Sequence, residues 1–164
     1  KKILIIILIS LFFNSYSYSA STERPEDLEY RNASNSNFKK GYNAMKQANK
    51  YEKKGKKDKA KKRFNDAVKF FVLANDEIPD EPDVLNYLGY SYRKVGDFAM
   101  AEIYYSQGLE IDPKHHGLNE YMGKLYIQTN RIEKAKERLQ VLKDCKCKEF
   151  KDLEIAIKKN DSKY

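Results

Sequence analysis

The sequence predicts an all-α protein built as an α-solenoid of antiparallel helix pairs, about three pairs followed by a C-terminal capping helix. The composition is typical of a mostly helical chain, since 34% of the 164 residues are charged and only 7 Gly and 4 Pro are present. From Phe38 onward, apolar residues recur every three or four positions, as they do on one face of a helix. The pattern around Leu88 also returns about 34 residues later, which indicates a structural repeat.

Residues 1–20 are expected to be a secretory signal peptide that is cleaved within a few residues of Ser19. Lys1 and Lys2 precede an apolar run that ends at Phe13, and small residues follow it. A membrane-spanning helix needs about 20 apolar residues, and this run has roughly half of them, so cleavage is favoured over an uncleaved anchor. No cysteine directly follows the run. We therefore expect a periplasmic or secreted protein that is not anchored through a lipoprotein cysteine.

The formal net charge is +8, and it becomes +6 without residues 1–20, because they hold two lysines and no acid. In an exported protein this excess favours anionic lipid, a wall polymer or an acidic partner, and no nucleic acid is expected. Residues 21–37 are polar with few large apolar groups, so they are expected to form a flexible linker. The helical repeat domain is then predicted over 38–160.

The first helix pair is predicted over 38–79. Its Tyr51, Gly55 and Ala60 precede the corresponding residues of the next pair by 41 positions instead of 34. The seven extra residues amount to two helical turns. The proline at position 79, however, precedes Pro113 by only 34 positions. The insertion is therefore expected before this proline, in the second helix of the pair.

The clearest pair is predicted over 82–113. Apolar residues at helical spacing flank the Leu88-Gly89 pair in its first half and continue through its second half. Gly96 is expected to adopt the left-handed conformation of a tight interhelix turn, and Pro113 stops the second helix.

The third pair is predicted over 116–144, because a shift of 34 residues turns Leu88-Gly89 into Met122-Gly123. The same shift turns Gly96 into Asn130, and Asn is the usual substitute for Gly in the left-handed conformation. Both glycines of the first helices, Gly89 and Gly123, are expected to allow close helix approach.

One more amphipathic helix, expected over 148–160, carries Phe150, Leu153 and Ile157 at helical spacing. Terminal repeats need such a cap to cover their exposed apolar face.

Residues 82–113 resemble the tetratricopeptide repeat, a family of antiparallel helix pairs. The Leu-Gly pair, the Gly-Asp-aromatic turn and the closing Asp-Pro all match, whereas Leu85 stands where Trp is usual and Gly108 where Ala is usual. The resemblance extends over about 38–160. It implies a curved stack whose concave groove is lined by the first helix of each pair and holds a peptide or a partner's helix.

The resemblance therefore suggests a protein-protein interaction module, a scaffold or adaptor. Its expected groove residues are Tyr42, Asn49, Asn86, Tyr90, Arg93, Lys94, Glu120 and Lys124. Their mixture suits a polar, partly acidic peptide. The alternatives are that these residues are only solvated, or that partners use the convex side. Some relatives clamp a terminal carboxylate with basic residues, but Met45 and Tyr121 stand near those positions here, which disfavours that use.

A run of ten basic residues between Lys46 and Arg63 contains only two acids, Glu52 and Asp58. Its centre, formed by Lys53, Lys54, Lys56 and Lys57, is a candidate contact for anionic lipid or wall polymer, which gives the alternative function of a structural envelope protein. A solvated lysine-rich face is the simpler interpretation.

Cys145 and Cys147 are the only cysteines, and because export would permit it, we expect a structural disulfide between them. Their side chains would diverge on a helix, so this bond requires a non-helical turn before the cap. Intermolecular pairing, free thiols and metal binding remain alternatives. His115 and His116 are adjacent, and no third ligand stands near them in the sequence, so no metal site is expected.

No serine-histidine-acid set, paired inward carboxylates or glycine-rich phosphate loop stands out in the sequence. The length leaves room for one domain. We therefore expect no enzymatic activity and no cofactor, and a protein or peptide partner whose identity the sequence does not give.

Overall fold

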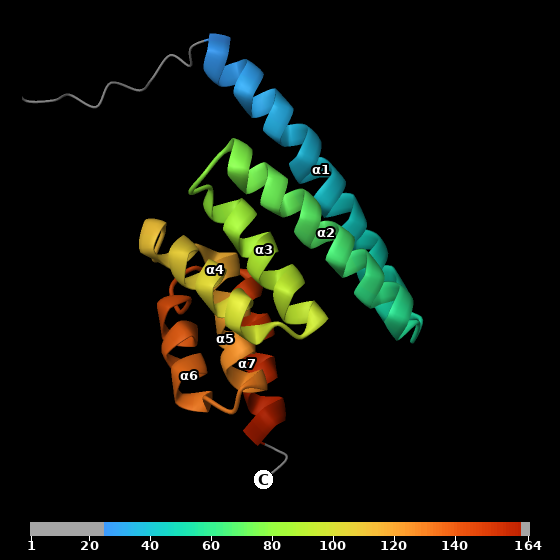
Figure 1. Cartoon of the computed structure of the whole chain (residues 1–164). Helices are drawn as coiled ribbons and strands as arrows, with labels where there is room; N and C mark the ends of the chain where they lie inside the picture. The colour runs from blue at the N-terminus through green and yellow to red at the C-terminus, as the bar shows by residue number, and fades with distance from the viewer. Residues whose placement is uncertain (1–24, 162–164) are drawn as a thin grey trace, which may run out of the picture.

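The structure, a computed structural model, describes residues 25–161, with side chains from 36 to 160. Within this range the chain forms seven helices and no strand. They are α1 (Pro25–Lys53), α2 (Lys57–Glu77), α3 (Pro82–Val95), α4 (Phe98–Ile111), α5 (His116–Gln128), α6 (Ile132–Val141) and α7 (Lys148–Asp161). The helices pack as antiparallel pairs, α1 with α2, α3 with α4 and α5 with α6, and α7 packs on α5 at the end of the stack (Figure 1). This confirms the predicted fold class.

The N-terminal part of the chain differs from the expectation where it is described. The expected signal segment, residues 1–20, lies outside the described residues. The expected flexible linker, residues 21–37, is helical from Pro25 onward, because α1 begins there. Proline is well placed in the first turn of a helix, and no Gly or Pro interrupts the chain between Pro25 and Gly41. Once the packed part of α1 is helical, adding further residues to its N-terminal end costs little free energy, because the helix is already nucleated. A polar composition does not prevent such an extension. No helix in the described range is both long and apolar enough to span a bilayer.

The turns follow the predicted backbone chemistry. Gly96 ends α3 with φ 95°, and its N–H donates to the carbonyls of Tyr92 and Arg93. Asn130, between α5 and α6, has φ 59°, so both predicted left-handed positions are confirmed. Asp97 caps the N-terminus of α4, because its side chain accepts a hydrogen bond from the Met100 N–H at 3.1 Å.

The first pair is longer than the second, as the spacing of the sequence predicted. Helix α2 has 21 residues and α4 has 14, a difference of seven. Phe64 and Phe71 of α2 are fully buried and alternate with buried alanines, so large and small side chains interlock between α1 and α2.

Two glycines allow close packing, as expected. A Cβ added at Gly89 would lie 2.4 Å from the ring of Tyr105 on α4, and one added at Gly123 would lie 2.6 Å from Leu153 on α7. Leu153 and Ile157 are buried against Ala135 and Leu142 of the last pair. Helix α7 therefore caps the stack.

Candidate partner-binding groove

The first helices of the pairs, α1, α3 and α5, lie next to one another, and α7 follows α5. Side chains expected in the groove connect the first two of them. The hydroxyl of Tyr90 on α3 donates a hydrogen bond to Asn49 Oδ1 on α1 at 2.7 Å, and Lys94 forms an ion pair with Glu52. Polar side-chain contacts therefore join α1 and α3 on this face.

Arg93 connects α3 to α5. Its Nη1 donates to Gln128 Oε1 at 2.7 Å, and its guanidinium carbon lies 5.5 Å from the ring centre of Tyr90 and 5.9 Å from that of Tyr121. The two tyrosine rings are 4.9 Å apart, so Tyr90, Arg93 and Tyr121 form one group, which we call the Tyr–Arg cluster. Burial raises the pKa of both tyrosines, so their hydroxyls are neutral and able to donate at physiological pH.

The remaining predicted groove residues lie on both sides of this cluster. Tyr42 of α1 is 38% exposed, with its ring 5.7 Å from that of Tyr87. Lys124 of α5 forms an ion pair with Glu120 and lies 5.6 Å from the ring of Tyr121. Exposed aromatic and charged groups on rigid helices are the usual composition of a protein-binding surface.

An open cleft of about 440 Å³ lies at the N-terminal ends of α3 and α5, beside α7. Its walls are polar. The residues that line it are Asp83, Asn86, Tyr87, Asp112, Lys114, His115, His116, Gly117, Glu120, Tyr121 and Glu149. Tyr121 belongs both to the cleft and to the Tyr–Arg cluster, so the two features are continuous.

Carboxylates dominate the charge of the cleft. His115 Nε2 lies 3.2 Å from Asp83 Oδ1, and this hydrogen bond lowers the pKa of Asp83. Burial raises the pKa of Glu120, while its bond with Lys124 opposes that effect. Glu149 makes no ion pair within residues 36–160. The cleft is therefore acidic, and it differs in charge from the lysine-rich end of α1.

Asn86 is the polar group of the cleft with an unmet hydrogen bond. The residue is 4% exposed, and its Oδ1 has no partner among the described residues. The amide lies against Gly117, where an added Cβ would be 2.7 Å from Nδ2. A buried polar atom without a partner costs about 1–3 kcal/mol, so a ligand that bonds this amide would recover part of that free energy.

The eight predicted groove residues thus lie on one face, but they differ in how far they are exposed to solvent. Asn86 and Glu120 are 4% and 5% exposed, because neighbouring helices pack beside them, and both line the cleft. The sequence interpretation missed His115 and Glu149 as cleft residues. His115 carried a local signal, since it precedes α5 and its Nδ1 accepts from the Leu118 N–H at 3.2 Å, whereas Glu149 lies on the distant α7.

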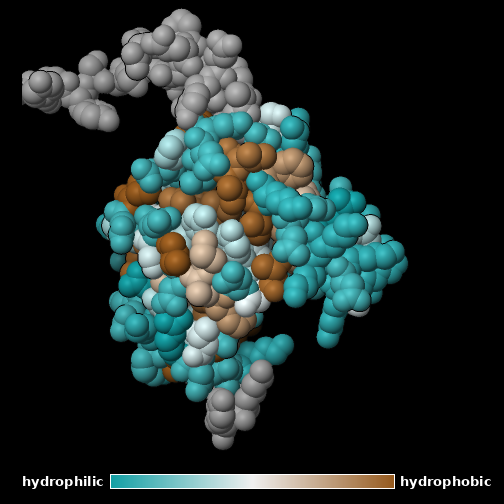
Figure 2. Space-filling view, viewed as in Figure 1, coloured by the Kyte–Doolittle hydropathy of each residue, from teal (hydrophilic) through white to brown (hydrophobic). Residues whose placement is uncertain are grey.

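The four predicted surface lysines, Lys53, Lys54, Lys56 and Lys57, surround the α1–α2 turn, and all are exposed. None of them makes an ion pair within the described side chains. Gly55, with φ 68°, forms the turn between them. The hydrophilic lobe on the right of Figure 2 lies where this turn projects in Figure 1. This tip is therefore a separate basic surface.

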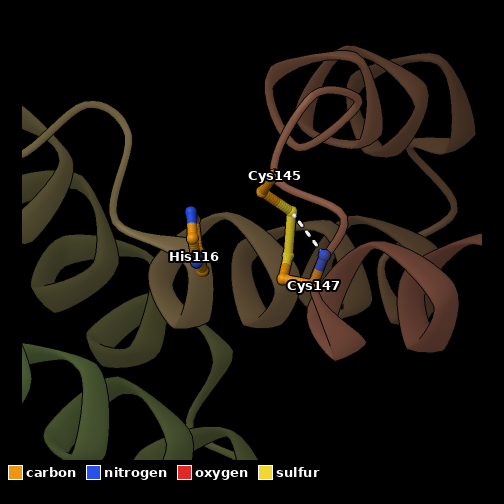
Figure 3. Close-up of side chains that lie close together, drawn as sticks. All are labelled: His116, Cys145 and Cys147. Atoms are coloured by element: carbon orange, nitrogen blue, oxygen red, sulfur yellow. Dashed lines mark hydrogen bonds between the residues drawn. A yellow bond between two sulfur atoms is a disulfide. The ribbon is translucent and has the colours of Figure 1, made fainter.

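The predicted cysteine pair lies in the non-helical segment between α6 and α7. The Sγ atoms of Cys145 and Cys147 lie at bonding distance, and Lys146 between them has φ 50°. The redox state of the pair stays a prediction, which mass measurement of the purified chain would test. The fold also places His116 beside the pair (Figure 3), a third possible ligand that lies about 30 residues earlier in the sequence.

Comparison with known proteins agrees with this architecture. The family model of the tetratricopeptide repeat matches residues 82–115. Residues 82–115 therefore form a tetratricopeptide repeat. The matched segment includes α3, α4 and the turn that leads to the cleft. The comparison with curated protein sequences gave no match.

Two solved structures share the fold of this repeat protein. The first repeat domain of Spaghetti (RPAP3), bound to the HSP90 peptide SRMEEVD, has a TM-score of 0.53 and 19% identity, covering 77% of this chain and 94% of that one. The first repeat domain of human RPAP3, solved by NMR, has a TM-score of 0.52 and 18% identity, covering 76% and 98%. At these identities the likeness extends to the fold alone. A role in protein interaction and the absence of enzymatic activity both stay predictions.

Proposed function

We propose that this chain is an exported protein-interaction module that holds an extended segment of a partner protein along α1, α3 and α5. The observation that carries the proposal is the acidic cleft with the unpaired Asn86 amide, which opens beside the Tyr–Arg cluster. Together they offer a polar depression and an aromatic contact surface on rigid helices. The fold gives a precedent, since the similar domain of Spaghetti is bound to a peptide.

The charges of the groove favour a particular polarity of partner. Asp83, Glu120 and Glu149 suit a lysine, arginine or amine group in the cleft, and the Asn86 oxygen can accept a hydrogen bond from it. The partly acidic peptide expected from the sequence suits the other end, where Lys46 and Lys50 of α1 are exposed. The proposed segment therefore carries a basic group at the cleft and acidic residues toward the end of α1.

A crosslinking pull-down from the native envelope tests this function with Arg93→Glu. Reversing the charge removes the bond to Gln128 and both aromatic contacts, so we expect capture of the partner to fall about tenfold or more, the effect of losing an arginine hot spot. The matched control is Arg63→Glu on α2, whose guanidinium pairs with Asp66 instead of the groove residues, and which should capture normally.

A second variant separates binding from folding. Glu149→Lys reverses a cleft charge that makes no ion pair among the described residues, so the fold should be retained while binding of the basic group is lost. Circular dichroism checks the helix content of each variant. Full capture by both Arg93→Glu and Glu149→Lys would contradict binding in the groove.

The alternative function is a structural envelope protein that associates with anionic lipid or wall polymer. The specific observation in its favour is the exposed lysine tip, where four lysines surround one turn without an ion pair among the described residues. Each lysine near an anionic surface contributes about 1 kcal/mol, and salt screens the attraction.

Replacing Lys53, Lys54, Lys56 and Lys57 by Glu is expected to abolish sedimentation with vesicles that contain phosphatidylglycerol. The loss of four lysine contacts corresponds to about 4 kcal/mol, roughly a thousandfold in affinity. Sedimentation at low and high salt measures it, with neutral phosphatidylcholine vesicles as the control. If the quadruple variant binds these vesicles as the wild type does, the tip does not hold the surface. Partner capture should be unaffected in either result.

A further inference from the structure

The segment between α6 and α7 brings two sulfur ligands and one nitrogen ligand together. Cys145 and Cys147 offer Sγ atoms, His116 at the start of α5 offers a ring nitrogen, and these three atoms all lie within 4.8 Å of one another. Figure 3 shows His116 on the neighbouring helix, on the side where the segment with the cysteine pair lies. Ligands bonded to one Zn²⁺ at 2.0–2.3 Å lie roughly 3.5–3.8 Å apart in tetrahedral geometry. The two sulfurs must therefore move apart after reduction, while the imidazole nitrogen already lies within reach of both.

The local backbone holds both sulfurs on one side. Lys146 has the left-handed φ of 50°, which a non-glycine residue rarely adopts, and it leaves the two Cα atoms 5.1 Å apart. The N–H of Cys147 donates to Cys145 Sγ at 3.3 Å. Cys147 also directly precedes the 14-residue helix α7. A donated N–H and a helix N-terminus both stabilise a thiolate, the form that binds metal.

A purely structural role explains this pair poorly. A cross-link between residues two positions apart closes a very short loop, so it restricts the unfolded chain far less than a long-range disulfide does. The pair is also accessible, because His116 is exposed and both cysteines are only half-buried. His116 and Glu149 line the same acidic cleft, whose carboxylates favour the approach of a cation.

We propose that Cys145, Cys147 and His116 bind Zn²⁺ when the cysteine pair is reduced, and that oxidation to the disulfide abolishes binding. A dithiol reductant supplies two electrons and two protons to the S–S bond, giving two thiols, and is itself oxidised to a disulfide. The two thiols release their protons as Zn²⁺ binds, the neutral imidazole is the third ligand, and water completes the tetrahedron. The site lies at the rim of the cleft but does not depend on partner binding.

The test is Zn²⁺ binding by the mature chain, kept reduced with a phosphine, measured by calorimetry, with Co²⁺ as a spectroscopic probe. We expect one-to-one binding and a thiolate-to-Co²⁺ charge-transfer band in the near ultraviolet. Cys145→Ser and Cys147→Ser should remove the band, and His116→Ala should weaken Zn²⁺ binding about tenfold or more. Helix content by circular dichroism confirms that each variant is folded.

The adjacent histidine gives a matched control. His115 bonds Asp83 and the first turn of α5 and lies outside the ligand cluster, so His115→Asn, which keeps a helix-capping side chain, should bind Zn²⁺ as the wild type does. Two results would overturn the proposal: equal affinity of His116→Ala and the wild type, or binding that persists after the pair is oxidised. Both readouts are independent of the partner protein.

Discussion

Replacing Tyr105 by Ala is expected to lower the free energy of unfolding by about 3–5 kcal/mol, as for other large buried aromatics. Tyr105 of α4 is fully buried, and its ring fills the space that Gly89 leaves on α3. It belongs to the same apolar cluster as Leu118 and Met122 of α5, so the cavity would weaken contacts across two helix pairs. Urea denaturation followed by circular dichroism measures the change.

The control for this change is Tyr105→Phe, which keeps the ring and removes only the hydroxyl. That hydroxyl is buried and has no hydrogen-bond partner among the described residues, and burial raises its pKa, so it stays protonated. We expect stability within about 1 kcal/mol of the wild type, or slightly above it. A loss as large as that of Tyr105→Ala would show that the hydroxyl is bonded, and Arg93 Nε, which is also buried and unpaired, would be its partner.

This pair of variants connects the core to the groove. Arg93 belongs to the Tyr–Arg cluster on one side of α3, while Gly89 on the same helix packs against Tyr105. A cavity at Tyr105 would therefore loosen the helix that presents Tyr90 and Arg93. We expect Tyr105→Ala to reduce partner capture as well as stability, whereas Tyr105→Phe should leave capture unchanged.

The sequence was sufficient for features that depend on neighbouring residues. Gly96 and Asn130 were predicted as left-handed because one turn geometry recurs after 34 residues, and both have positive φ. The two extra turns were assigned to the second helix of the first pair because the offset between the pairs falls from 41 to 34 positions by the closing proline, and α2 has the added seven residues. Turn conformation and helix length depend on residues within one helix pair, so they can be predicted from a single sequence.

Features that depend on how pairs stack could not be predicted in the same way. Asn86 and Glu120 were placed on the outward face by helical register, but contacts from the next helices in the stack bury them. His116 and the cysteine pair meet because α7 folds back onto α5. The two sites are about 30 residues apart in the sequence, and the spacing of apolar residues within a helix does not predict a contact at that separation. The helical start at Pro25 likewise depends on continuation from packed residues of α1.

Leu153→Ala is expected to lower the free energy of unfolding by about 2–5 kcal/mol, because Leu153 is the fully buried centre of the contact between α7 and the last pair. The matched control is Ile155→Ala on the same helix. Ile155 is 61% exposed, so its loss should change stability by no more than about 0.5 kcal/mol. Similar losses for both variants would contradict a specific capping contact.

The double-mutant cycle with Gly123→Ala tests whether α7 is fitted into the stack or only covers it. Alone, Gly123→Ala should cost about 1–3 kcal/mol, because its Cβ would lie 2.6 Å from a Leu153 methyl group. With Leu153→Ala in place that methyl group is absent and the added Cβ fills part of the cavity, so the double variant should be more stable than the sum of the two losses predicts. Strict additivity would mean that α5 and α7 can separate without strain. A favourable coupling would instead show that the missing side chain at Gly123 is the feature that lets α7 close the repeat stack.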